Sequence, residues 1–182
     1  MHTNDPAPPA PPASPSAHEI DEATLALARD MFQHARSGAA EQLGIFLARG
    51  LPPNLRNERG DSLLMLASYH GHLDATRVLL EHGADPHLIN DAGQTPLHGA
   101  AFKGDLPIVT LLLDQGALPD HAGPSGKTAL MFAAMFNRVA IAQLLIERGA
   151  DPAARDADGV SALDAARRMG AADTAALLAP PN

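Results

Sequence analysis

The 182-residue sequence contains no cysteine and no tryptophan, and its aromatic residues are one tyrosine and five phenylalanines. The absence of cysteine excludes a disulfide framework, a thiol nucleophile and any zinc site that needs thiolate ligands. Hydrophobic residues still make up 46% of the chain, which is enough for a core. Because alanine and leucine dominate this set, we expect closely packed helices.

Positive charge is also scarce. The 13 Lys and Arg residues face 21 Asp and Glu residues, for a net charge of -8. Nucleic acids and anionic membranes require clustered Lys and Arg, so neither is expected as a partner, and basic ligands are slightly favoured. No apolar run has the length of a transmembrane helix or the character of a signal peptide. This pattern predicts a cytoplasmic protein.

Proline is concentrated near the N-terminus. Residues 1–19 are predicted to form a disordered Pro-rich tail, and residues 20–182 a single repeat domain. The tail also has the PxxP spacing that proline-reading modules bind, carried by Pro8, Pro9, Pro11 and Pro12. That spacing arises easily in a Pro-rich segment, so a docking role for the tail is the alternative interpretation.

Glycine recurs with a fixed step of 33 residues. One series is Gly60, Gly93, Gly126 and Gly159, and a second is Gly50, Gly83, Gly116 and Gly149. An uninterrupted period of this length is typical of a tandem array of stacked units. The units are full repeats over 57–89, 90–122 and 123–155, a short C-terminal cap over 156–182, and a fainter N-terminal cap over about 24–56.

Each unit is predicted to form a turn and two short helices. In the unit 90–122, Thr95 caps a helix that has Pro96 at its first position and runs through Lys103. A second helix is expected over about 107–115, because its leucines leave one apolar face. Helices this short are unstable alone, so each unit must pack against its neighbours.

Stacking predicts one continuous core. The aligned positions are Leu64, Leu97, Leu130 and Leu163, then Ala67, Ala100, Ala133 and Ala166, then Leu79, Leu112, Leu145 and Leu178. Asn137 stands where other units have Gly71 and Gly104, and asparagine tolerates the left-handed conformation best among non-glycine residues. Asp85 and Asp151 recur in loops, where they are expected to accept hydrogen bonds from the loop backbone.

These units resemble ankyrin repeats. Residues 90–98, NDAGQTPLH, resemble the turn and TPLH opening of that family, and the GADP of residues 83–86 and 149–152 resembles its GADxN loop. TPLH is complete in one unit, so the hydrogen bonds made by the family's Thr and His are expected once, at Thr95 and His98.

The resemblance is strong over residues 57–179 and weaker over 24–56. It implies an all-α solenoid of about five helix-turn-helix repeats, caps included, with β-turn tips on one side. It also implies a non-catalytic module without a cofactor, which binds a protein partner through the concave face made by the tips and the exposed side of each first helix.

Carried onto this chain, that face includes eleven candidate partner-binding residues. The tips supply Arg59, Asp61, Asp91, Gln94 and Lys127, and the first helices supply Tyr69, His70, Phe102, Lys103, Met135 and Phe136. Tyr69, Phe102 and Phe136 are half of the six phenylalanines and tyrosines, at positions that the fold is expected to leave largely exposed. Exposed aromatic clusters are typical of binding surfaces. The alternative is that these rings fold back and pack on the neighbouring unit.

Three patterns that resemble chemical sites have a simpler interpretation. Residues 123–128, GPSGKT, resemble part of a phosphate-binding loop. The first glycine of such a loop is missing, because His121 stands at its position, and no buried strand is expected before it. The nine histidines lack the i, i+3 or i, i+4 spacing of ligands on one helix face, so no metal site is predicted. The loop carboxylates repeat with the units and do not converge, so no catalytic residue is predicted.

We therefore expect a small, free-standing, monomeric module that binds an unidentified protein. The alternative is a structural or self-assembling scaffold, in which an exposed helix surface or an end unit contacts another copy.

Overall fold

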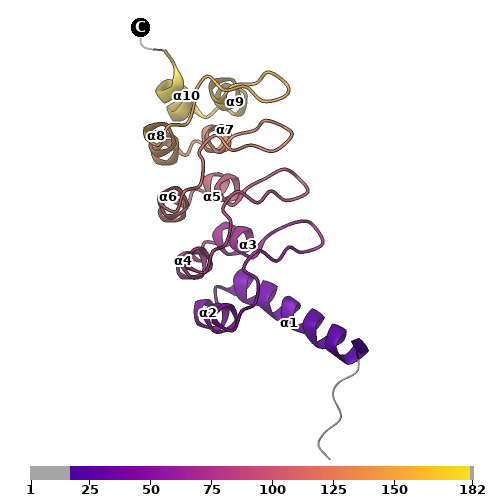
Figure 1. The fold of residues 1–182 in the computed structure, drawn as a ribbon. Helices are drawn as coiled ribbons and strands as arrows, with labels where there is room; N and C mark the ends of the chain where they lie inside the picture. The colour runs from indigo at the N-terminus through magenta and orange to yellow at the C-terminus, as the bar shows by residue number, and fades with distance from the viewer. Residues whose placement is uncertain (1–16, 181–182) are drawn as a thin grey trace, which may run out of the picture.

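The computed structural model describes residues 17–180, which form a stack of helical pairs (Figure 1). The helices in this range are α1 (Ala17–Ser37), α2 (Ala40–Ala48), α3 (Leu63–Tyr69), α4 (Leu73–Glu81), α5 (Pro96–Lys103), α6 (Leu106–Asp114), α7 (Ala129–Met135), α8 (Val139–Glu147), α9 (Ala162–Met169) and α10 (Ala172–Leu178). The predicted all-α repeat fold is confirmed. Residues 1–16, most of the expected Pro-rich tail, lie outside the described residues.

The two helices of each unit belong to separate columns. Figure 1 shows α3, α5, α7 and α9 as one column, which we call the inner helices, beside the projecting loops. The outer helices α2, α4, α6, α8 and α10 form the other column. Each inner helix packs on the next, and each outer helix does the same. The loops that project from the inner column are the predicted turn tips.

Hydroxyl side chains start all four inner helices. Ser62, Thr95, Thr128 and Ser161 have extended backbones, and each side chain accepts a hydrogen bond from the backbone N–H three residues on, which satisfies one of the unpaired donors at a helix start. The predicted first helix, Pro96 to Lys103, has the observed limits. The second begins one residue earlier than expected, at Leu106, because Asp105 caps it.

The core runs without a break through the stack. Leu64, Leu97 and Leu130 are buried, whereas Leu163, in the last inner helix, is partly exposed. The outer row behaves alike, because Leu112 is fully buried and Leu178 is not. The end unit has a neighbour on one side alone, so it buries less apolar surface.

The loop aspartates have the predicted role. An Asp85 carboxylate oxygen accepts a hydrogen bond from the backbone N–H of His87 at 2.8 Å, and Asp151 accepts one from Ala153 at 2.8 Å. In each loop, the aspartate side chain bonds to the backbone two residues later and so forms a turn. These carboxylates therefore organise the connections between units.

The N-terminal unit departs most from the repeat. Its first helix, α1, is 21 residues long and begins at Ala17, before the expected domain start at residue 20. Figure 1 shows α1 extending past α2 on the side where the tips of the other units project. A helix thus occupies the place of a turn tip, which explains why this unit has no turn signature.

Asn137 joins two units as well as adopting the left-handed backbone. Its φ is 55°, the one positive φ of a described non-glycine residue. Its side-chain oxygen accepts a hydrogen bond from the backbone N–H of Thr174 at 3.0 Å, and its amide donates to Asp173 at 2.8 Å. Asn137 therefore caps α10, whose own N-cap, Ala171, offers no side-chain acceptor.

We expect Asn137→Ala to lower the free energy of unfolding by about 2 kcal/mol, because it loses the cap and strains an alanine at positive φ. Asn137→Gly also loses the cap, but glycine adopts a positive φ without strain, so we expect it to lower the free energy of unfolding by about 1 kcal/mol. Urea denaturation followed by circular dichroism measures both. Equal costs for the two variants would show that the backbone conformation contributes nothing.

Candidate functional site

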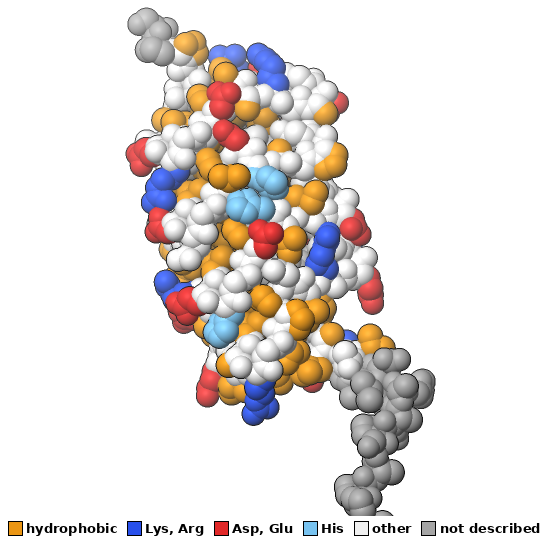
Figure 2. Space-filling view, viewed as in Figure 1, with side chains coloured by type: hydrophobic (Ala, Val, Ile, Leu, Met, Phe, Trp, Pro, Cys, Tyr) orange, Lys and Arg blue, Asp and Glu red, His pale blue; other side chains and the backbone are white. Residues whose placement is uncertain are grey.

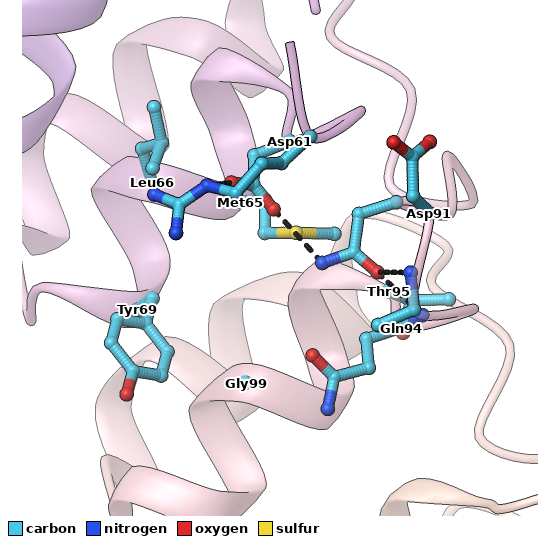
Figure 3. Close-up of a pocket in the computed structure, with 11 residues that line it drawn as sticks. Asp61, Met65, Leu66, Tyr69, Asp91, Gln94, Thr95 and Gly99 are labelled. Carbon is cyan, nitrogen blue, oxygen red and sulfur yellow. Dashed lines mark hydrogen bonds and ion pairs between the residues drawn. The ribbon is translucent and has the colours of Figure 1, made fainter. Parts of the chain in front are cut away.

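A large hollow in the described part of the chain lies on the tip side of α3 and α5. Its volume is about 480 Å³, and Figure 3 shows Tyr69 and Gln94 on either side of Gly99. Met65 and Leu66 contribute its apolar lining from α3. The other lining residues are Arg59, Asp61, Asn90, Asp91, Ala92 and Thr95. The hollow therefore joins an apolar helix surface to the polar ends of two turn tips.

One repeat position varies in size along the inner helices. Leu66, Gly99, Phe132 and Ala165 are equivalent, one in each inner helix. The large hollow lies beside Gly99, and a smaller one of about 180 Å³ lies beside Ala165, lined also by Lys127 and Met135. Phe132 has a large side chain at this position, and its ring packs with His98 at 5.4 Å between centroids. Small residues thus stand beside these two hollows, where a larger side chain would take up part of the space.

Hydrogen bonds hold the two tips beside the large hollow in place. The side-chain oxygen of Asn90 accepts from the backbone N–H groups of Ala92 and Gln94, and its amide donates to Asp61 at 2.9 Å. The guanidinium Nε of Arg59 lies 3.7 Å from a carboxylate oxygen of Asp61. The backbone carbonyl of Arg59 accepts a hydrogen bond from the backbone N–H of Asp91 at 3.0 Å. The polar rim of the hollow is therefore preformed.

The aromatic side chains form a continuous row along the inner helices. Tyr69 stacks on Phe102 with ring centroids 6.3 Å apart, and Phe102 meets Phe136 edge-on at 4.6 Å. The ammonium of Lys103 lies 5.1 Å from the centre of the Tyr69 ring, a cation–π distance. We call Tyr69, Phe102 and Phe136 the aromatic row.

The expected exposure of the aromatic row is correct for one ring and wrong for two. Tyr69 is 39% exposed, whereas Phe102 and Phe136 are half-buried, as is Met135. Each phenylalanine loses exposed surface to the ring of the neighbouring unit. Packing and exposure, which were alternatives in the sequence, therefore occur together.

The structure divides the eleven candidate residues among three places on this side of the stack. Arg59, Asp61, Tyr69, Asp91 and Gln94 line the large hollow, Lys127 and Met135 line the small one, and His70, Lys103, Phe102 and Phe136 lie at the ends of the inner helices. Sequence reasoning missed Met65, Asn90 and Gly99. A signal for Gly99 was present, because it stands where two other units have leucine and phenylalanine.

His98 has a structural position below this surface. Its Nδ1 accepts a hydrogen bond from the backbone N–H of Thr95 at 3.1 Å, and the backbone N–H of His98 donates to the Thr95 hydroxyl at 3.3 Å. Both bonds agree with the prediction. Ser161 and Asp164 form a reciprocal pair of the same kind at the start of α9, with other residue types. The Ser161 hydroxyl, and after it the Ser161 backbone N–H, donates a hydrogen bond to the Asp164 carboxylate and holds its pKa below the usual value.

Burial lowers the pKa of His98 to about 4. The backbone of His121 raises it in part, and the charge of the His121 ring lowers it further. The His98 Nε2 lies near that backbone but makes no hydrogen bond of normal geometry within the described residues. His98 is therefore neutral near pH 7, with its proton on Nε2, because Nδ1 is an acceptor.

Residues 123–128 have structural roles in the third unit. A Cβ atom on Gly123 would lie 2.6 Å from the Cα of Gly93, so the two tips require a glycine there. Gly126 has a φ of 69°, Thr128 caps α7, and Lys127 is exposed. The packing of the repeat thus accounts for the residues that resemble a phosphate-binding loop.

Histidine side chains are visible near the middle of the face in Figure 2, where acidic and basic side chains are interspersed. His72 contacts the Arg36 carbonyl with Nε2, and His82 contacts the Val78 carbonyl with Nδ1, each at 2.8 Å. Within the described residues, no three His, Asp or Glu side chains are close enough to hold a metal ion.

Membrane insertion has no candidate segment in residues 17–180. A spanning helix needs about 20 predominantly apolar residues, and no described helix combines sufficient length with sufficient hydropathy.

Comparison with known proteins agrees with this architecture. The family model for ankyrin repeats (3 copies) matches residues 31–122 and 118–182. A Pseudomonas aeruginosa protein whose name assigns it to the ankyrin repeats is 55% identical over 60 residues, which are 33% of this chain and 35% of that relative. The aligned segment thus spans about a third of the relative's length. Because the family model covers most of the sequence, from residue 31 to its end, the chain belongs to the ankyrin repeat family.

Proposed function

We propose that the chain binds a protein partner across the tip side of its inner helices. Ankyrin repeats are in general protein–protein interaction modules and in general not catalytic. The observation that supports this surface is the position of Tyr69, which lines the large hollow and also begins the aromatic row. A concave apolar site with a fixed polar rim is typical of a binding site.

The hollow and the aromatic row give the partner two different contacts. The hollow beside Gly99 accepts an inserted side chain, which would lie against the apolar lining of Met65 and Leu66. The Tyr69 ring, already fixed by Phe102 and Lys103, offers an apolar face without loss of side-chain entropy. The partner segment is therefore expected to run across the tips, from one inner helix to the next.

The double variant Tyr69→Ala/Phe102→Ala is expected to lower capture of the partner at least tenfold, because aromatic residues at the centre of an interface carry much of the binding energy. The measurement is affinity capture from a lysate of the source organism, quantified by mass spectrometry. Leu106→Ala/Leu118→Ala is the matched control, because both leucines are exposed outside this face. Equal capture by all three proteins would contradict the proposal.

Gly99→Leu tests the hollow without removing a ring. Leucine at this position is compatible with the repeat, because Leu66 is its equivalent in the preceding unit. A Cβ on Gly99 would lie 3.3 Å from the Tyr69 ring, so the exposed tyrosine would shift slightly. We expect the Gly99→Leu variant to fold and to capture less of the proteins that the unchanged chain captures.

Light scattering of these samples tests self-assembly. A molecular mass that rises with protein concentration would favour the scaffold alternative.

A further inference from the structure

A second large hollow lies between α1 and the first turn tip. Its volume is about 400 Å³, and its apolar lining includes Leu25 and Phe32 of α1. Leu25 is 58% exposed, which is a large unburied apolar surface for a helix side chain. This hollow exists because α1 extends where the other units have a turn tip.

Arginine surrounds this hollow. Arg29 and Arg36 come from α1, and Arg56 and Arg59 come from the first tip; Glu58 is the one carboxylate in the lining. These four arginines are a large share of the 13 basic residues of a chain with a net charge of -8. The local charge is therefore opposite to that of the whole molecule.

The described residues do little to neutralise these arginines. Arg56 donates its hydrogen bonds to the carbonyls of Gly60 and Ile89, which are uncharged. Arg59 has a single ion pair, with Asp61 at 3.7 Å, and its side chain is 79% exposed. Arg29 and Arg36 have no ion pair within the described part of the chain. Their charges remain available to a ligand.

We propose that this hollow binds an acidic segment of the partner protein, with an apolar side chain on Leu25 and Phe32 and carboxylates at the arginines. Guanidinium groups bind carboxylates through paired, charge-assisted hydrogen bonds. Arg59 lines both this hollow and the large hollow beside Gly99. The acidic-peptide site therefore extends the surface proposed above for partner binding, and the proposal rests on that function. The partner segment is acidic at this end and becomes uncharged or basic beyond it.

The surroundings favour an acidic peptide over a nucleic acid. A phosphate chain needs a continuous row of cations, but a strand that continued past Arg59 would meet Asp61 and Asp91 at the next hollow. The apolar lining also offers nothing to a phosphate, whereas a peptide places an apolar side chain beside its carboxylates.

The test begins with a phage-displayed library of random dodecapeptides, selected on the full chain. We expect enrichment of Asp and Glu next to an aromatic or aliphatic residue. The strongest such peptide is then synthesised together with a copy in which Asn and Gln replace Asp and Glu. Fluorescence anisotropy measures both, with oligo-dT as the nucleic-acid probe.

Arg29→Gln/Arg36→Gln is expected to weaken the acidic peptide about tenfold. Arg49→Gln/Arg77→Gln removes the same charge from exposed arginines of the outer-helix side and is expected to leave the affinity unchanged. The site is rejected if selection yields no acidic enrichment, if the neutral copy binds equally well, if both double variants behave alike, or if oligo-dT competes at equal affinity.

The two proposals fail separately. If lysate capture depends on Tyr69 and Phe102 but no acidic peptide is selected, the concave surface stands and this hollow is not a binding site. If an acidic peptide binds through Arg29 and Arg36 while the Tyr69 and Phe102 variant captures normally, the hollow stands and the aromatic row is structural.

Discussion

Leu112→Ala is expected to lower the free energy of unfolding by about 3 to 4 kcal/mol, the largest loss that we predict from one substitution. Leu112 is fully buried in α6, which packs between α4 and α8. The variant removes three methylene-sized groups from a site enclosed by two neighbouring units, which leaves a cavity in the core. In a stack held by neighbour contacts, that loss weakens both interfaces of the middle unit.

The equivalent Leu178→Ala in α10 provides the matched control. Leu178 is partly exposed and has a neighbouring unit on one side, so its expected cost is about half as large. Urea denaturation of both variants, followed by circular dichroism, gives the two values. If Leu178→Ala cost as much as Leu112→Ala, stability would not depend on position in the stack.

The glycine period predicted most of the fold. It placed the inner and outer helices of the unit 90–122 within one residue of the observed limits, because turn glycines, capping hydroxyls and leucine spacing are local signals. The exception is α1, which continues where the other units have a turn signature. A missing signal does not say which structure replaces it, so the helix from Ala17 was not predicted.

The candidate site was predictable in outline. The repeat register showed which side chains share the tip side, so Arg59, Tyr69 and Gln94 were grouped correctly. It did not show that Tyr69, Phe102 and Phe136 pack ring against ring, because the distance between neighbouring units decides that contact. The arginine-lined hollow was hidden for another reason: Arg29 and Arg56 belong to different units, and α1 brings them together.

The charge of the whole chain differs in sign from the charge around the hollow beside α1. A net charge of -8 slightly favoured basic partners, yet the hollow beside α1 carries four arginines and one glutamate. Exposed charges act over about a Debye length, roughly 8 Å at physiological salt. A ligand that touches Arg29 therefore responds to its immediate neighbours more than to distant carboxylates.

Acidification from pH 6.5 to pH 4 is expected to lower the free energy of unfolding by about 3 kcal/mol through His98 alone. The ordinary pKa of histidine, 6.5, falls to about 4 in the folded chain because the ring is buried. Between these values the unfolded chain binds a proton at His98 and the folded chain does not. Stability is thus unaffected above pH 6.5, declines as the pH falls through this window, and loses no more once the folded ring also protonates.

His98→Met isolates this effect, because Met65 and Met131 occupy the equivalent position in the neighbouring units. The other eight histidines remain in the variant, so the difference between the two pH profiles belongs to His98. Asp164 does not interfere, because its pKa is lowered from 3.8 and its stabilisation is lost below pH 4. Urea denaturation at several pH values measures both proteins. Parallel profiles would mean that the His98 ring accepts a proton as readily in the folded chain as in the unfolded one, which requires water or a carboxylate to reach a ring that this structure encloses.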